Sequence, residues 1–295
     1  MKRLLDKIFK RKPAAPSRAV TLPLGDADSL APASRGSGFY HLISGSSLDA
    51  GRRRDNNEDA LLCINVALGA EQAAQPLGLY AIADGMGGHR NGELASEAAV
   101  RAWGSALLGK LYKLLFGPNP QPAEESLREL MEAAVGEAHR AVTKSAPGGG
   151  CTLTAALVVG NQMVVAHLGD SRAYAVHRDG RMQQLTRDHT LVQRLQEMGQ
   201  LSAEEAASHP QKSVLYRALG QGGAAQPEIF ISSLPNPGSL LLCSDGLWGV
   251  VSDDEIQRIV NSTDSPHLAC QKLVQAANHA GGPDNISVIL VRATA

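Results

Sequence analysis

The sequence predicts an α+β domain in which strands and helices form separate layers. Three strand-like runs follow one another between Thr152 and His177 without an intervening helix. This disfavours a parallel, doubly wound sheet, because parallel neighbours need long crossover connections. Two long segments, Glu93–Leu115 and Glu124–Lys144, are rich in alanine and carry apolar residues three and four positions apart, as amphipathic helices do. Hairpins combined with such helices are typical of layered α+β domains.

The first 38 residues differ in composition from the remainder. Residues 1–12 carry six basic residues and one acid, with apolar residues at helical spacing. Charged residues interrupt the apolar centre that a secretory signal requires. Two interpretations stay open: a poorly ordered, solubilising terminus, or a short helix on the inner, anionic face of a membrane. Residues 13–38 are rich in Pro, Ala, Ser and Gly and predict a flexible linker, so the folded domain covers residues 39–295.

Charge and cysteine content narrow the possible partners and compartment. The 28 basic and 29 acidic residues nearly cancel, and aromatic residues make up only 4% of the chain, so nucleic acid is not an expected partner. No apolar run approaches the ~18–20 residues of a membrane span. The four cysteines show no zinc-ligand spacing, and three lie in apolar runs. We therefore expect reduced thiols, a cytoplasmic location and, by default, a monomer.

The strands are predicted from short apolar or β-branched runs bounded by turn residues. The runs are Leu61–Val66, Leu79–Ala83, Thr152–Val159, Met163–Leu168, Arg172–His177, Leu240–Cys243 and Ile286–Val291. Asp179-Gly180 predicts a two-residue hairpin turn leading into a further short run, Met182–Leu185.

Four further helices are predicted from their end signals. Ser202 and Ser252 each precede a glutamate by three residues, which is the capping-box pattern. Pro266 opens a last helix that ends at His279 before two glycines and a proline. Asp188 is predicted to cap a helix over 190–198, although Asp188 and the following histidine could instead reach the functional site.

Four aspartates stand where a short apolar run meets a turn: Asp59, Asp84, Asp245 and Asp284. Three of them have an ordinary explanation: a solvated ion-pair cluster for Asp59, and glycine turns for Asp84 and Asp284. Asp245 follows three leucines and a cysteine, where a carboxylate is costly unless it is paired or binds metal. Converging carboxylates repel one another unless divalent cations neutralise them.

The same pattern suggests phosphate chemistry. Carboxylates at strand ends are hard oxygen ligands that suit Mg²⁺ or Mn²⁺. Gly85, next to Asp84, can turn its carbonyl toward a cation. Two bridged metals can hold a water and lower its pKa, and Arg54 offers a planar donor for the other phosphate oxygens. We therefore predict a metal site built around a phosphate monoester.

Five motifs in order resemble the metal-dependent protein phosphatases (the PPM, or type 2C, serine/threonine phosphatases), with the bacterial branch most similar. The resemblance runs from Ile43 to Val291. The motifs are Arg54-x-x-Asn57-Glu58-Asp59, Ala83-Asp84-Gly85-Met86-Gly87-Gly88-His89, Gly169-Asp170-Ser171-Arg172, Ser244-Asp245-Gly246-Leu247 and Asp284-Asn285. The fold that this resemblance implies is a four-layer αββα sandwich of two antiparallel sheets flanked by helices.

The resemblance also implies a role for each matched residue. Two Mn²⁺ or Mg²⁺ ions are expected per site, with Asp84 as the bridging ligand and Asp170 joining Asp245 at a third, weaker ion. The full expected set is Asp59, Asp84, Asp245 and Asp284 as ligands, Gly85 through its carbonyl, Glu58 through water, Asp170 for the third ion and Arg54 for the phosphate.

The implied activity is hydrolysis of phosphoserine and phosphothreonine in proteins, by direct attack of a hydroxide bridging the metals. The opposing enzyme would be a bacterial eukaryotic-like Ser/Thr kinase. Two other classes compete with this interpretation. One is an inactive relative that binds phosphoproteins, which the complete acid set disfavours. The other is a membrane-tethered interaction protein that acts through its basic N-terminus.

Three features concern positions near the expected site. Met86 stands where the animal enzymes have a histidine offered as general acid, so the proton donor is another group or water. His89 is interpreted as an ordinary surface residue. Residues 188–219 correspond to the family's flap, a segment beside the active site that is predicted to contribute to substrate selection.

Overall fold

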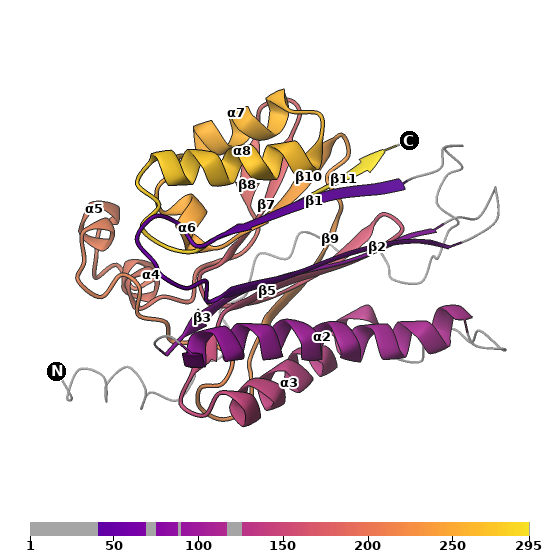
Figure 1. Cartoon of the computed structure of the whole chain (residues 1–295), viewed down its shortest axis with the longest axis horizontal. Helices are drawn as coiled ribbons and strands as arrows, with labels where there is room; N and C mark the ends of the chain where they lie inside the picture. The colour runs from indigo at the N-terminus through magenta and orange to yellow at the C-terminus, as the bar shows by residue number, and fades with distance from the viewer. Residues whose placement is uncertain (1–40, 69–74, 88–89, 117–125, 295) are drawn as a thin grey trace. The chain divides into compact units, whose positions relative to one another are not determined.

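The computed structural model describes residues 41–68, 75–87, 90–116 and 126–294. These residues form two antiparallel sheets packed face to face, with helices on both outer faces (Figure 1). Three apolar clusters fill the spaces between the layers. The predicted four-layer sandwich is confirmed. The predictions for residues 1–38 lie outside the described residues.

The first sheet has five strands, and two of its four neighbouring pairs join strands that are not consecutive in sequence. Its order is β1 (His41–Asp49), β11 (Ile286–Thr294), β10 (Gly238–Cys243), β7 (Arg172–His177) and β8 (Met182–Gln184). The second sheet has the order β2 (Asp59–Leu68), β3 (Gln75–Met86), β5 (Leu153–Val159), β6 (Gln162–Leu168) and β9 (Glu228–Ser233), with β4 (Gly150–Cys151) paired to β3.

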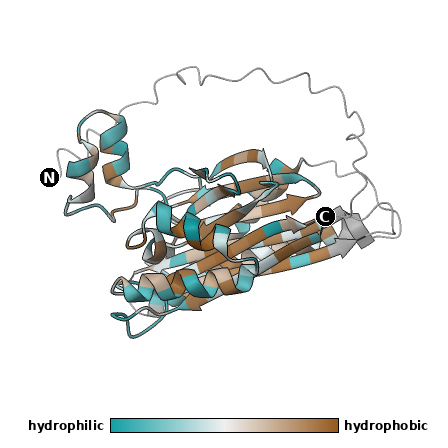
Figure 2. Ribbon diagram, turned by 90° about the horizontal axis from the view of Figure 1, so that it is seen from above, coloured by the Kyte–Doolittle hydropathy of each residue, from teal (hydrophilic) through white to brown (hydrophobic). Residues whose placement is uncertain are grey.

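The central strands are apolar on both faces because each face meets a different layer. In β3, Tyr80 and Ile82 point between the sheets, whereas Leu79 and Ala81 point toward the helices. Successive side chains of a strand alternate between faces, so one continuous apolar run serves two cores. Figure 2 shows this concentration of apolar residues on the strands.

Helices cover the outer face of each sheet. The second sheet packs against α2 (Arg90–Phe116) and α3 (Leu127–Ser145), and the first against α6 (Asp245–Trp248), α7 (Asp253–Ser262) and α8 (Pro266–His279). Two short helices, α4 (Leu191–Glu197) and α5 (Ala203–Ala207), lie in the 188–219 segment. None of the helices within the described ranges is long and apolar enough to cross a membrane.

Most predicted elements are present, and three strands were not predicted: β1, the two-residue β4 and β9. β1 is polar and contains Gly45, yet it pairs with β11 along its whole length. A side chain at Gly45 would collide with the backbone of His267, so α8 packs directly on this strand. β9 is short, lies at the edge of its sheet and has one buried residue, Ile229. Backbone pairing, rather than apolar content, determines the positions of β1 and β9.

Two local predictions are wrong. Asp188 does not cap α4: Thr190 does, through its hydroxyl, which accepts a hydrogen bond from the Gln193 N–H at 3.2 Å. Asp188 is unavailable because both of its oxygens accept hydrogen bonds from Arg172. The β7–β8 hairpin exists, but its loop comprises residues 178–181 rather than the two residues Asp179-Gly180.

A buried arginine ties β11 to the end of α7. Arg292 is only 6% exposed. Its guanidinium donates to the carbonyl oxygens of Val260, Thr263 and Asp264 at 2.6–2.9 Å and to the Ser239 hydroxyl at 2.9 Å. These carbonyls lie at the C-terminal end of a helix, where a cation is favoured by the helix dipole.

Replacing Arg292 by methionine should lower the free energy of unfolding by on the order of 2–4 kcal/mol, because several carbonyls lose charged donors at once. Urea denaturation of the full chain measures this loss. Arg258→Met is the matched control, since Arg258 forms an exposed pair with Glu255 in the same region. Such surface pairs contribute little. An Arg292 variant as stable as the Arg258 variant would show that the buried contacts do not stabilise the fold.

Candidate metal centre

The predicted acids gather at one end of the two sheets. Asp59 and Asp84 are directly opposite each other in the β2–β3 ladder. Asp245 is the first residue of α6, directly after β10, and Asp284 lies just before β11. Asp170 lies in the turn between β6 and β7. Four of these acids, all except Asp59, line a cavity of about 370 Å³.

Asp59 is held on one side only. Its Oδ2 accepts hydrogen bonds from the hydroxyls of Ser244 and Ser287 at 2.8 and 2.6 Å. Its Oδ1 is buried and has no hydrogen-bond partner. A carboxylate with one oxygen fixed and the other bare is suited to ligate a cation.

Burial and mutual repulsion disfavour the ionised acids. Burial, and to a lesser extent the charges of Asp245 and Asp284, raise the pKa of Asp59 to about 7, even though the two serines stabilise its charged form. Burial also raises the pKa of Asp84 well above its ordinary range, followed by the charges of Asp59 and Asp245. Such a cluster becomes favourable when cations neutralise it.

The second pair of acids shows the same effect. Burial, followed by the charges of Asp245 and Asp188, raises the pKa of Asp170 to about 8. Burial and the charge of Asp284 raise the pKa of Asp245 to about 6. Asp245 Oδ1 is a second buried oxygen without a partner.

Gly85 occupies a position where no side chain fits. A Cβ at Gly85 would collide with the carbonyl of Gly92 in the first turn of α2 and with the carbonyl of Glu58. The backbone around Gly85 is fixed, since its N–H donates to the Glu58 carbonyl and Thr152 donates its N–H to the Asp84 carbonyl at 2.9 Å. The Gly85 residue itself lines the cavity.

The acids do not form a closed ligand set in this arrangement. Within the described parts of the chain, no three His, Cys, Asp or Glu side chains are grouped as ligands of one ion. Asp284 is engaged elsewhere, because its Oδ2 pairs with the Arg54 guanidinium at 2.8 Å. The residues nevertheless fit divalent cations, because the set is made of hard oxygens and two of these are buried without a partner.

The loop that carries Arg54 is fixed by one asparagine. Asn285 Oδ1 accepts the Glu58 N–H at 2.8 Å, and its amide group donates to the carbonyls of Ala50 and Asn56 at 3.0 and 2.9 Å. Arg54 and Glu58 both line the cavity. The Arg54 side chain is 53% exposed, which leaves its guanidinium accessible to a ligand.

Sequence reasoning missed the residues that hold these acids. Ser287 has no role in the sequence prediction, and Ser244 and Asn285 appear there only as parts of motifs. A signal was present, because Ser287 interrupts an apolar strand and Ser244 precedes an aspartate at a strand end. Met86 lines the cavity as expected, and among the described residues no histidine does. His89 is not described.

Comparison with known proteins agrees with this geometry. Residues 52–279 match the family model described as protein phosphatase 2C. The chain is 37% identical over 243 residues to the serine/threonine phosphatase stp of Listeria innocua, covering 82% of this chain and 92% of that protein.

Solved structures of two bacterial phosphatases are similar in fold. The serine/threonine phosphatase of S. agalactiae is 33% identical, with a TM-score of 0.72 over 85% of this chain and 99% of that one. The catalytic domain of PstP, in complex with two manganese ions, is 31% identical, with a TM-score of 0.68 over 87% and 100% of the two chains. This chain therefore belongs to the protein phosphatase 2C family.

Proposed function

We propose that this protein hydrolyses phosphoserine and phosphothreonine monoesters in phosphoproteins, with two Mn²⁺ or Mg²⁺ ions per site. The observation that carries the proposal is the cavity in which buried, mutually repelling aspartates meet one accessible arginine. A relative with the same fold binds two manganese ions. Members of this family are serine/threonine phosphatases, as the relatives' names state.

The proposed ligands are Asp59, Asp84, Asp245 and Asp284, with the Gly85 carbonyl, and with Glu58 acting through water. The ions would supply a water of lowered pKa and neutralise charge that develops on the phosphoryl oxygens. The hydroxyls of Ser244 and Ser287 fix Asp59 Oδ2 and leave Oδ1 without a partner, so Oδ1 is the oxygen proposed to bind metal.

Arg54 is proposed to bind the phosphate. Its guanidinium presents paired N–H donors that match two phosphate oxygens. The same group pairs with Asp284 at 2.8 Å, so an arriving phosphate would exchange one anionic partner for another. The proton for the leaving alkoxide is proposed to come from water or a group other than Met86, whose thioether carries no transferable proton.

Phosphate release from a phosphothreonine peptide tests the function. The full chain should release phosphate with Mn²⁺ and not after treatment with a chelator. Asp245→Ala should remove this activity. Asp179→Ala should retain it, because Asp179 belongs to an exposed ion pair in the β7–β8 loop. No Mn²⁺-dependent release from the folded wild-type protein would refute the proposal, and binding of the intact phosphopeptide would then favour a non-enzymatic phosphoprotein-binding role.

Metal binding should stabilise the protein more at high pH than at low pH. The raised pKa values of Asp59 and Asp245, about 7 and about 6, mean that the folded protein without metal holds protons that the unfolded chain releases near pH 4. The stability of the metal-free protein therefore falls as pH rises through this window. Since metal replaces these protons, Mn²⁺ should raise the melting temperature more at about pH 8 than at about pH 5.5. An equal rise at both values would contradict the protonated cluster.

We further propose that a third, weaker ion binds between Asp170 and Asp245, that a Ser/Thr kinase produces the substrates, and that the protein acts as a cytoplasmic monomer. The tail, residues 1–12, is proposed to make at most weak contact with a membrane surface. Sedimentation of the full chain with anionic vesicles, against a chain that begins at residue 39, tests the tail. Equal binding of both would rule out the membrane contact.

A further inference from the structure

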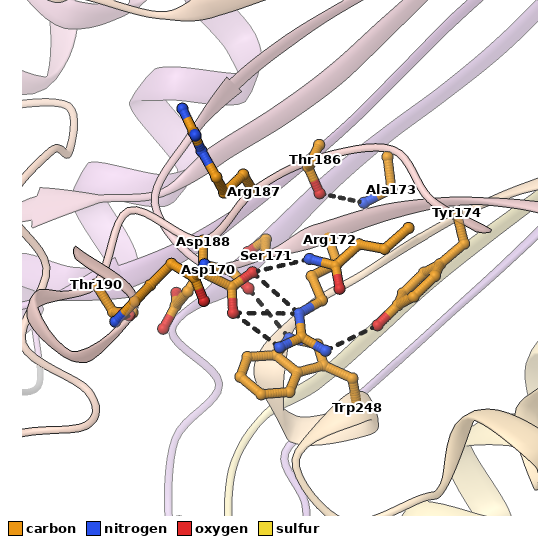
Figure 3. Close-up of polar contacts among 12 residues, drawn as sticks. Asp170, Ser171, Arg172, Ala173, Tyr174, Thr186, Arg187, Asp188, Thr190 and Trp248 are labelled. Carbon is orange, nitrogen blue, oxygen red and sulfur yellow. Dashed lines mark hydrogen bonds and ion pairs between the residues drawn. The ribbon is translucent and has the colours of Figure 1, made fainter. Parts of the chain in front are cut away.

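Arg172 is the centre of a polar cluster beside the metal site (Figure 3). Its Nε and Nη2 donate to Asp188 Oδ1 and Oδ2 at 3.0 and 2.8 Å, which makes the ion pair bidentate. Its Nη1 donates to the Tyr174 hydroxyl at 3.0 Å. The two partners of the ion pair are only 18% and 9% exposed. A buried, bidentate pair fixes the positions of both side chains.

The flat face of the same guanidinium lies on an indole. Arg172 Cζ is 3.5 Å from the centre of the Trp248 ring. Trp248 ends α6, the helix whose first residue is Asp245. Its Nε1–H donates to the main-chain carbonyl of Asp170 at 3.1 Å. The Trp248 indole therefore connects α6, which carries the proposed ligand Asp245, to the backbone of Asp170.

The start of the 188–219 segment is hydrogen-bonded to the turn between β6 and β7, which contains Asp170. The His189 N–H donates to the Gly169 carbonyl at 2.7 Å, and the Gly169 N–H donates to His189 Nδ1 at 3.2 Å. His189 follows Asp188 directly, so the ion pair and these two bonds hold the same stretch of chain. The backbone of Gly169 and Asp170 is thus held by Trp248 of α6 and by His189 of the 188–219 segment, and Arg172 contacts Trp248 and Asp188.

We propose that Arg172 is a positioning residue that holds Asp170 for the third ion, through Asp188 and Trp248. The inference deepens the proposed function and rests on it. A planar fork with a stackable face is required, because one group must bind a carboxylate edge-on and an indole face-on. Lysine would keep the positive charge, but it could neither form the bidentate pair with Asp188 nor stack on Trp248. Without the fork, the carboxylate of Asp188 would also stand beside Asp170 without its bidentate partner.

Counting bound Mn²⁺ in the full chain tests the proposal. Equilibrium titration, with free Mn²⁺ followed by electron paramagnetic resonance, should show two tight ions and a weaker third in the wild type. Asp170→Asn should remove the third. Arg172→Lys should keep the two tight ions and weaken the third by about 10-fold or more, which is the usual effect of outer partners of a ligand.

Two further variants separate positioning from general structural damage. Trp248→Phe keeps a smaller aromatic ring under the guanidinium and removes the N–H donor to Asp170, so it should weaken the third ion without unfolding the protein. Arg181→Lys is the matched control, because Arg181 pairs with Asp179 in the exposed β7–β8 loop; it should bind Mn²⁺ as the wild type does.

Three results would overturn the inference. They are a third ion of wild-type affinity in both Arg172→Lys and Trp248→Phe, an equal loss of all three ions in Arg172→Lys, and a wild-type protein that binds only two ions. In each case Mn²⁺-dependent hydrolysis by the wild type would leave the proposed phosphatase function standing. Absence of that hydrolysis would refute the function separately.

Discussion

Replacing Asp84 by asparagine should abolish Mn²⁺-dependent phosphate release while making the metal-free protein more stable. The pKa of Asp84 is raised well above its ordinary range, because burial and then the charges of four neighbouring acids disfavour its ionised form. Asparagine keeps the size and the backbone contacts, including the Asp84 N–H that donates to the Thr152 hydroxyl at 2.9 Å. The substitution removes the charge and leaves the local fold in place.

The two effects have one cause. The negative charge of a buried acid in a repelling cluster destabilises the metal-free protein, and the same charge binds metal. Removing it therefore lowers activity and raises the stability of the metal-free protein. The rate should fall by more than about 100-fold, since even the outer partners of a ligand are commonly worth about 10–100-fold. At neutral pH in the presence of a chelator, the melting temperature should rise.

Steady-state kinetics and thermal unfolding measure the two quantities on the same preparations. Asp179→Asn is the control, because Asp179 is an exposed aspartate in the β7–β8 loop and should change neither quantity. An Asp84→Asn protein with wild-type turnover would exclude Asp84 as a ligand. A lower melting temperature without metal would show that Asp84 stabilises the fold by contacts rather than straining it.

Much of the fold was predictable because its signals are local. The central strands are continuous apolar runs, and α5 begins at a capping box in which Ser202 and Glu205 each bond the other's backbone. Among the strands that were missed, β1 and β9 carry weaker apolar patterns. Their places depend on backbone pairing with β11 and β6, residues far away in sequence. Single-sequence patterns do not contain such pairing.

The acids were predictable, and the groups that position them were not. A carboxylate after Leu240–Cys243 is conspicuous on its own, since burial of an unpaired charge is costly. By contrast, Ser287 reaches Asp59 across 228 positions, and Asn285 reaches Glu58 across 227. The prediction for Asp188 failed for a similar reason: a cap is a local signal, whereas the competing partner, Arg172, lies on β7.

Replacing Arg54 by alanine should lower kcat/KM for a phosphothreonine peptide by about 100- to 1,000-fold, the usual effect of deleting one donor to the developing charge of a transition state. Arg54 is half exposed, so the melting temperature should stay the same. Lysine should recover part of the rate through its charge, but it cannot bind two phosphate oxygens in the plane of one group.

Arg53→Ala is the matched control, because Arg53 is exposed, lies in the same loop and does not line the cavity. Mn²⁺ affinity separates two possible roles of Arg54. If Arg54 binds phosphate, its removal frees Asp284 from the 2.8 Å ion pair, and Mn²⁺ should bind at least as tightly as in the wild type. If Arg54 instead serves to orient Asp284 as a ligand, Mn²⁺ affinity and rate should fall together. Equal kinetics of the Arg54 and Arg53 variants would remove Arg54 from the site altogether, and the phosphate would then be held by the metals alone.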